Sequence, residues 1–176
     1  FGDEALTDVS NVGEDGKLLS IHDRRRQYGL SNRLWHTDAS FQEPPGRYSM
    51  LSAKSVPAEG GDTEFANTRD AYYMLPRELR NKITSLKTHH SIAYSRELLG
   101  FEFSSKEAVS LKGVEQPLVR ENIRTGLKSI YVASHCSSVI GMPVPDGRIL
   151  IHDLIEYSTR DSLVYRHTWQ ENDFVI

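Results

Sequence analysis

The stretch Leu34-Trp35-His36-Thr37-Asp38-Ala39-Ser40-Phe41 decides how the rest of this chain is interpreted. It contains a His-x-Asp triplet, which we expect in a strand, where side chains at i and i+2 point to the same face. His36 and Asp38 would then converge on one point. An imidazole and a carboxylate are two of the three protein ligands in a two-His-one-carboxylate iron site. The alternative is a surface pair in which Asp38 orients the His36 ring without a metal.

Further motifs follow this stretch in a fixed order. They are Glu43-Pro44-Pro45-Gly46, Gly60-Gly61-Asp62-Thr63, Gln116–Arg120, Gly126–Val132 and Arg166-His167-Thr168-Trp169. From about Asn32 to the end, this order resembles the taurine dioxygenase family of Fe(II)/2-oxoglutarate-dependent oxygenases. The segments Trp35–Gln42 and Ser134-His135-Cys136-Ser137 resemble the branch of that family that acts on phenoxyalkanoate herbicides such as 2,4-dichlorophenoxyacetate.

The resemblance implies a double-stranded β-helix, or jelly roll, with flanking helices, incomplete at the C-terminus. It also implies Fe(II) as cofactor, with 2-oxoglutarate and O2 as cosubstrates. His36 and Asp38 match the first two iron ligands, while the third ligand, a His, and the arginine that binds 2-oxoglutarate lie beyond Ile176. Thr63 matches the threonine whose hydroxyl donates to the far carboxylate of 2-oxoglutarate. The alternative for Thr63 is an ordinary strand threonine.

Three residues are candidates for contact with a small-molecule carboxylate substrate. Asn32, four residues before His36, matches a family position that contacts substrate, and loop capping is its alternative role. His89 or His90 would supply a cationic or hydrogen-bond-donating side chain to the substrate carboxylate.

Length and composition limit the class of protein. The 176 residues fit a single domain, residues 1–176, long enough to bury a sizeable core. A net charge of −3 argues against a nucleic-acid partner. The single cysteine, Cys136, excludes an internal disulfide, and no apolar stretch approaches the length of about 18 residues that would indicate a membrane span. We expect a cytoplasmic protein, and the sequence leaves homo-oligomer formation open.

The two ends of the chain predict a fragment of a longer protein. The chain begins at Phe1 rather than Met and stops at the apolar run Phe174-Val175-Ile176. A natural domain rarely stops part-way into a buried-looking strand, because the strand edge would be left unpaired. Alone, such a fragment is expected to bind iron poorly and to be inactive.

The pattern of apolar residues predicts an α+β fold, mainly β. Strands are expected at residues 6–12, 17–21, 36–38, 47–56, 63–66, 117–122, 129–134 and 163–169, with an Asp15-Gly16 turn joining the first two. Helices are expected at about 67–75, 76–86 and 148–158, and loops at 22–31 and 137–145. Residues 95–113 have no clear period and predict a lid-like insertion that is helical around 104–109.

Three functional hypotheses follow. The leading one is an Fe(II)- and 2-oxoglutarate-dependent dioxygenase that hydroxylates an aryloxyalkanoate next to its ether oxygen, releasing a phenol, succinate and CO2. A sulfonate or sulfate-ester oxygenase would use the same metal and cosubstrate. A catalytically silent jelly-roll binding module would keep the fold without a complete site. A Trp-Asp-Asn motif followed by His and Arg beyond Ile176 would distinguish the enzymes from the silent module.

Overall fold

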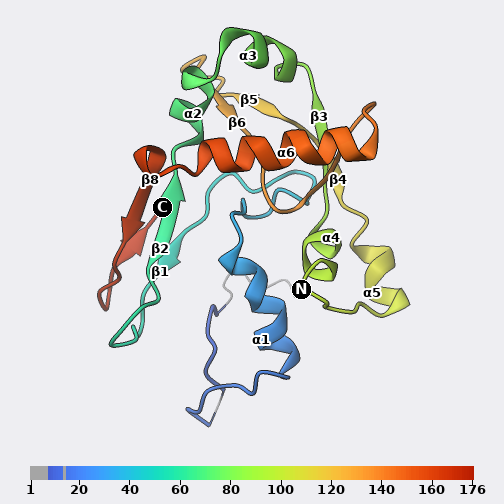
Figure 1. The fold of residues 1–176 in the computed structure, drawn as a ribbon. Coiled ribbons are helices and arrows are strands. Elements are labelled where there is room, and N and C mark those ends of the chain that lie inside the picture. The colour runs from blue at the N-terminus through green and yellow to red at the C-terminus, as the bar shows by residue number, and fades with distance from the viewer. Residues whose placement is uncertain (1–7, 14) are drawn as a thin grey trace.

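The computed structural model describes residues 8–13 and 15–176 (Figure 1). Its α-helices are α1 (Arg24–Gly29), α2 (Thr68–Met74), α3 (Arg77–Ile83), α4 (Ile92–Glu97), α5 (Ser105–Ser110) and α6 (Val144–Ser158). Two 3-10 helices are η1 (Leu30–Arg33) and η2 (Asp161–Leu163). The strands are β1 (Leu51–Ser52), β2 (Thr63–Ala66), β3 (Lys87–His90), β4 (Val114–Pro117), β5 (Val119–Glu121), β6 (Lys128–Ile130), β7 (Cys136–Val139), β8 (Val164–His167) and β9 (Phe174–Val175).

The strand pairs of the described residues are all antiparallel. β1 pairs with β9, β2 with β8 and β5 with β6, while β3 lies between β4 and β7. In Figure 1, β1, β2 and β8 lie near one end of α6, and β3 and β4 lie toward its other end. The β2–β8 register sets Thr63 opposite His167. Pairing across the length of the chain therefore brings Thr63 beside the strand that leads to Trp169.

Helix α6 contributes one face to the hydrophobic core. Its buried residues are Gly147, Leu150, Ile151, Leu154 and Ser158. These positions recur at the spacing of one helical face, and that face packs on β7 and α2. Leu154 is only 1% exposed, and burying a leucine side chain to this extent stabilises a fold by about 1.5–3 kcal/mol. A Cβ at Gly147 would lie 3.1 Å from the backbone nitrogen of Val139, so glycine favours the close approach of α6 to β7.

Most predicted helices are confirmed. Those expected at 67–75 and 76–86 are α2 and α3, and the one expected at 148–158 is part of the longer α6. Asn67 caps α2 through a hydrogen bond of 3.1 Å from the Asp70 backbone nitrogen. Helix α5 falls where partial helix was expected, and Ser104 and Glu107 form a capping box at its start.

The loop predicted for residues 22–31 is wrong, because this segment contains α1. The Asp23 carboxylate accepts a 2.8 Å hydrogen bond from the Arg25 backbone nitrogen and caps the start of the helix. Asp23 thus supplies a cap to a segment with little hydrophobic periodicity.

Three strand assignments also differ from prediction. The loop expected at 137–145 begins with β7, which pairs with β3. Residues 36–38 lead into a turn instead of forming a strand, and only Leu51–Ser52 of the strand expected at 47–56 is paired. A strand requires a hydrogen-bonded neighbour as well as an extended sequence pattern, and the local sequence does not identify that neighbour.

The predicted N-terminal hairpin lies partly outside the described residues, which omit 1–7 and 14. The described part contains one antiparallel bridge between Val12 and Leu18, with Gly16 at φ +73° in the turn. The predicted α+β class is confirmed. The expected predominance of strand is not found among residues 8–13 and 15–176, where the longest strands have four residues and α6 has fifteen. No helix among the described residues is long and apolar enough to cross a membrane.

Candidate metal centre and cosubstrate site

His36 and Asp38 lie side by side at the start of a turn. The Nε2 atom of His36 is 3.4 Å from Oδ1 of Asp38, and the side chains are 29% and 54% exposed, respectively. The Nδ1–H of His36 donates a 2.8 Å hydrogen bond to the carbonyl oxygen of Leu34, which fixes the orientation of the ring. Ala39 follows at φ +53° and turns the chain. The predicted pair is therefore brought together by a turn rather than by an extended strand.

His36 and Asp38 each stabilise the charged form of the other. Hydrogen bonding from His36, followed by that from Ser49, lowers the pKa of Asp38 to about 2. Hydrogen bonding to Asp38 raises the pKa of His36, so Nε2 carries a hydrogen in this contact. A metal ion here would replace the Nε2 hydrogen, because Nδ1 keeps its own hydrogen for Leu34 and the neutral ring then has its lone pair at Nε2. The hydroxyl of Ser49 donates to Oδ2 of Asp38 and leaves Oδ1 facing His36.

Thr63 is the first residue of β2, and Trp169 holds its side chain. The indole Nε1–H of Trp169 donates a 2.9 Å hydrogen bond to Oγ1 of Thr63. Because an indole nitrogen only donates, the hydroxyl hydrogen of Thr63 is directed to another acceptor. His167 is the β8 residue opposite Thr63. The Nε2 atom of His167 is 3.1 Å from Oδ2 of Asp173, and the ring packs edge-on against Trp169. These contacts give His167 a role in holding the turn after β8.

A buried imidazole, His135, lies against the metal pair. Its ring centroid is 6.1 Å from that of His36 and 5.2 Å from that of Phe41, with edge-on geometry in both cases. The Nδ1 atom of His135 lies 2.8 Å from Oγ of Ser95. Burial lowers the pKa of His135 to about 3, so the ring is neutral at physiological pH. Among the described residues, no group of three His, Cys, Asp or Glu side chains is arranged to hold a metal ion.

The predicted substrate residues lie in two different elements. Asn32 is exposed in η1, whereas His89 and His90 are neighbours in β3 and therefore point to opposite faces. His90 is fully buried, with Nε2 2.9 Å from Thr88 Oγ1 and 3.3 Å from Cys136 Sγ. Nδ1 of His89 lies 2.8 Å from a serine hydroxyl of β7. These hydrogen bonds lie within the β3–β7 pair, and the roles of all three residues toward substrate stay predictions.

Two cavities differ in whether they contact the His36–Asp38 pair. A cavity of about 240 Å³ adjoins His36 and is lined by residues of β2 and of the C-terminal end of α6, among them Phe65, Ile155 and Ser158. A larger groove of about 550 Å³ lies between α6 and the α2–α3 region. None of the predicted site residues lines the larger groove, whereas His36 lines the smaller cavity.

Several residues of this site were not recognisable from sequence. Ser49 contacts Asp38 from eleven residues away, and Ser95 contacts His135 from forty residues away. A lone serine outside a motif carries no signal of such a contact. Trp169 belongs to a recognised motif, although its bond to Thr63 depends on the pairing of β2 with β8.

Known proteins that resemble this chain are dioxygenases and related enzymes. A curated alpha-ketoglutarate-dependent 2,4-dichlorophenoxyacetate dioxygenase of Cupriavidus pinatubonensis is 43% identical over 172 residues, which cover 97% of this chain and 60% of that protein. An alkylsulfatase of Acinetobacter baylyi is 34% identical over 158 residues, 85% of this chain and 50% of that protein. The crystal structure of AAD-2 in complex with Mn(II) and N-oxalylglycine has a TM-score of 0.92 and 43% identity, and the match covers 97% of this chain and 62% of that one.

These matches cover almost all of this chain but only part of each relative. The chain spans about 60% of the length of the most similar of these curated relatives. A family model described as "Taurine catabolism dioxygenase TauD, TfdA family" matches residues 3–176. The predicted family is therefore confirmed, and the chain belongs to the TauD/TfdA dioxygenase family.

Proposed function

We propose that this chain forms part of an Fe(II)- and 2-oxoglutarate-dependent dioxygenase that hydroxylates an aryloxyalkanoate such as 2,4-dichlorophenoxyacetate. The observation that carries the proposal is the 3.4 Å approach of His36 Nε2 to Asp38 Oδ1. The 43% identity to a 2,4-dichlorophenoxyacetate dioxygenase supports the substrate class.

The two side chains fit an iron site. The hydrogen bond from His36 Nδ1 to Leu34 places Nε2 on the side of Asp38, where the metal would replace the Nε2 hydrogen, and Asp38 is anionic because its pKa is about 2. A neutral imidazole and a carboxylate are the ligand types that non-heme Fe(II) oxygenases use. His36 and Asp38 would hold the metal together with a third His, which we predict beyond Ile176.

Thr63 fits the role of hydrogen-bond donor to 2-oxoglutarate. Trp169 occupies one acceptor position of its hydroxyl, so the hydroxyl hydrogen is available to a carboxylate. The AAD-2 structure contains N-oxalylglycine, which differs from 2-oxoglutarate by an NH in place of a CH2 group. That similarity supports the proposed cosubstrate for this chain.

The proposed reaction consumes one 2-oxoglutarate and one O2 for each substrate. Bound Fe(II) and 2-oxoglutarate would supply the oxidising chemistry, in which the cosubstrate becomes succinate and CO2 and the substrate C–H bond becomes C–OH. The substrate carbon next to the ether oxygen then carries a hydroxyl group, which makes the product a hemiacetal. For 2,4-dichlorophenoxyacetate this hemiacetal breaks down to a phenol and glyoxylate. His36 and Asp38 bind and orient the metal, Ser49 holds Asp38, and Thr63 binds the cosubstrate.

The jelly-roll topology is part of the same proposal. Antiparallel pairing of β1 with β9 and of β2 with β8 supports it, since these pairs join strands of the first half of the chain to strands near its C-terminal end. We also propose that residues 95–113 act as a lid within a single domain 1–176. A cytoplasmic location is a further prediction of this proposal, which leaves homo-oligomer formation open.

A sulfate-ester oxygenase is the second candidate. The 34% identity to an alkylsulfatase supports it, and the same metal and cosubstrate would serve both reactions. The products differ, because oxidation next to a sulfate ester releases sulfate rather than a phenol.

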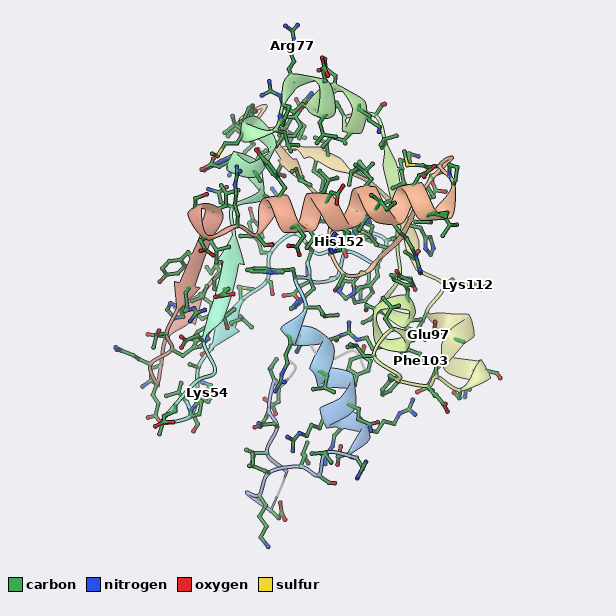
Figure 2. The ribbon with its side chains drawn as sticks, viewed as in Figure 1. Lys54, Arg77, Glu97, Phe103, Lys112 and His152 are labelled. Atoms are coloured by element: carbon green, nitrogen blue, oxygen red, sulfur yellow. The ribbon has the colours of Figure 1, made fainter. Side chains whose placement is uncertain are left out.

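The test uses the full-length protein with Fe(II), ascorbate and 2-oxoglutarate in air. We expect 2,4-dichlorophenoxyacetate to stimulate formation of succinate and phenol in equal amounts. His36→Ala should abolish both products, whereas His152→Ala should not, because His152 is an exposed histidine of α6 (Figure 2). Succinate formation stimulated only by a sulfate ester would favour the second candidate. No succinate with any substrate, together with no iron binding, would indicate the silent binding module.

A further inference from the structure

The turn that follows Asp38 has little support from its own backbone. Residues 38–46 lie outside every helix and strand. The backbone nitrogens of Gln42 and Gly46 donate to the Ala39 carbonyl oxygen at 3.2 and 3.4 Å, respectively. Both distances exceed the value of about 2.9–3.0 Å that is usual for such bonds. The carbonyl oxygens of Ser40 and Gln42 accept from no backbone nitrogen of the described residues, so the turn needs donors from elsewhere in the fold.

Gln116, a residue of β4, supplies those donors. Its Nε2 atom donates a 3.2 Å hydrogen bond to the carbonyl oxygen of Ser40 and a 3.3 Å hydrogen bond to that of Gln42. Carbonyl oxygens only accept, so the NH2 end of the amide, which carries two hydrogens, has to face the turn. Gln116 is 4% exposed, and water therefore has little access to replace these bonds. One side chain thus holds the turn at two points.

The backbone of Gln116 is fixed by the sheet. Gln116 lies opposite Thr88 in the antiparallel pairing of β4 with β3, and β3 is itself paired with β7 on its other side. The backbone nitrogen after β4, that of Leu118, donates a 2.9 Å hydrogen bond to the Leu86 carbonyl oxygen. The two hydrogen bonds from Gln116 therefore tie a turn without a strand partner to a three-stranded sheet.

The residues on this turn contact the metal pair from two directions. Asp38 begins the turn, with Oδ1 3.4 Å from Nε2 of His36. Phe41 lies between the two residues whose carbonyl oxygens Gln116 binds, and its ring packs edge-on against His135. The His135 ring packs edge-on in turn against His36. A shift of the turn would therefore change both the carboxylate and the aromatic contacts around His36.

We propose that Gln116 is a positioning residue for the metal site, an inference that rests on the proposed function. Gln116 does not contact the metal. It fixes the turn from below and so keeps Oδ1 of Asp38 beside His36. Ser49 donates to the other carboxylate oxygen, but it lies in an exposed segment and cannot hold the turn by itself. Groups that orient a metal ligand typically contribute about 10- to 100-fold to metal affinity.

A purely structural role for Gln116 makes a different prediction. If its side chain only fills space beneath the turn, a side chain of similar volume would replace it with little effect. If its loss only destabilises the sheet, any comparable loss of a hydrogen bond in the β3–β4 pair would lower metal affinity as much. A positioning role predicts that metal affinity falls only when the donors to the turn are removed.

The experiment uses the full-length protein and two variants of Gln116. Gln116→Met keeps the length of the side chain and removes both donors. Gln116→Glu keeps the shape and sets carboxylate oxygens against the two carbonyl oxygens. The matched control is Thr88→Val, because Thr88 is also fully buried and its hydroxyl bonds to His90 rather than to the turn.

Three quantities are measured for each variant. Anaerobic titration gives the dissociation constant for Fe(II), and urea denaturation gives the free energy of unfolding. Amide hydrogen exchange of the metal-free protein is followed at Gln42 and Gly46, the two amides that bond within the turn.

We expect Gln116→Met to weaken Fe(II) binding on the order of 10-fold and Gln116→Glu to weaken it further, because like partial charges then face each other. Thr88→Val should lose stability and bind Fe(II) as the unmodified protein does. Exchange at Gln42 and Gly46 should become faster in Gln116→Met and stay unchanged in Thr88→Val. Unchanged Fe(II) affinity in Gln116→Met would overturn the proposal, and so would an equal loss of affinity in Thr88→Val.

Failure of the proposed function gives a different result. If the unmodified full-length protein neither binds Fe(II) nor makes succinate, the proposed function fails. Exchange at Gln42 and Gly46 does not depend on iron, so it still tests the hold of Gln116 on the turn. Unchanged exchange in Gln116→Met would then overturn that role, and faster exchange would support it.

Discussion

The indole Nε1 of Trp169 lies 2.9 Å from Oγ1 of Thr63, a residue 106 positions earlier in the chain. The bond crosses the β2–β8 pair, in which Thr63 is opposite His167. Since the indole donates, the threonine hydroxyl has its own hydrogen to give to a ligand. This one contact both locks the turn after β8 and sets the direction in which Thr63 can donate.

Thr63→Val should weaken binding of 2-oxoglutarate while leaving iron binding unchanged. Valine keeps the strand and removes the hydroxyl, so we expect KM for 2-oxoglutarate to rise on the order of 10-fold, as for loss of a hydrogen bond to a charged group. Thr63→Ser keeps the hydroxyl and should stay close to the unmodified protein. The measurement is succinate formation against 2-oxoglutarate concentration. An unchanged KM in Thr63→Val would refute this role.

Ser49→Ala should weaken metal binding although Ser49 is not itself a predicted ligand. Its hydroxyl donates to Asp38 Oδ2, and groups that orient a ligand typically contribute about 10- to 100-fold to metal affinity. Anaerobic titration of the full-length protein with Fe(II) measures the affinity. Ser52→Ala, at an exposed position of β1, is the control and should bind iron normally. Equal affinities in the two variants would show that the Asp38 orientation does not depend on Ser49.

Gly113→Ala should destabilise the fold far more than Gly100→Ala. Both glycines have positive φ, +74° and +77°, so alanine is strained at either position. At Gly113 a Cβ would also lie 2.2 Å from the carbonyl oxygen of His90, whereas at Gly100 no atom lies within 4 Å. We expect a loss of about 1 kcal/mol at Gly100 and more than about 3 kcal/mol at Gly113. Urea denaturation checks this, and similar losses would mean that the β3 backbone moves to accommodate the methyl group.

His90 should make stability depend on pH between about 4 and 6.5. Burial lowers the pKa of His90 from 6.5 to about 4, so within this window the unfolded chain binds a proton that the folded chain does not. Stability is therefore fully present above pH 6.5 and falls as the pH drops toward 4, by up to about 1.4 kcal/mol per pH unit for this group. His90→Gln should show a shallower decline, measured by urea denaturation at a series of pH values.

The control for this pH dependence is His152→Gln. His152 is exposed on α6, so its replacement should leave the slope unchanged. Part of the decline should persist in His90→Gln, because burial lowers the pKa of His135 as well. A slope in His90→Gln identical to that of the unmodified protein would contradict the assignment to His90.

Helices and short-range pairs were the features most accessible to prediction. Asn67 at the start of α2 and the apolar spacing in α6 are local signals that act within one or two turns. His36 and Asp38 are two residues apart, so few backbone conformations separate their side chains widely. The turn at Ala39 brings them together although the expected strand is absent there.

Contacts between distant segments were not accessible in the same way. The sequence of the segment that forms β7 is typical of a loop, and the segment is a strand in the structure because it pairs with β3. Arg96 sits in a segment without clear periodicity, and nothing near it in sequence reveals that it is buried without a carboxylate partner among the described residues. Burial and strand pairing depend on which distant residues pack against a segment, and the local sequence carries little information about those contacts.

The sequence by itself determined the family, the His36–Asp38 pair and the identity of Thr63 as a candidate donor, because each rests on residue type and short spacing. Only the tertiary structure decided that Trp169 directs Thr63, that Ser49 holds Asp38, and that Ser95 contacts the His135 ring that packs against His36. The physical reason is distance along the chain. Short-range geometry follows from covalent limits on a few dihedral angles, whereas these contacts exist only once the strands and helices have packed.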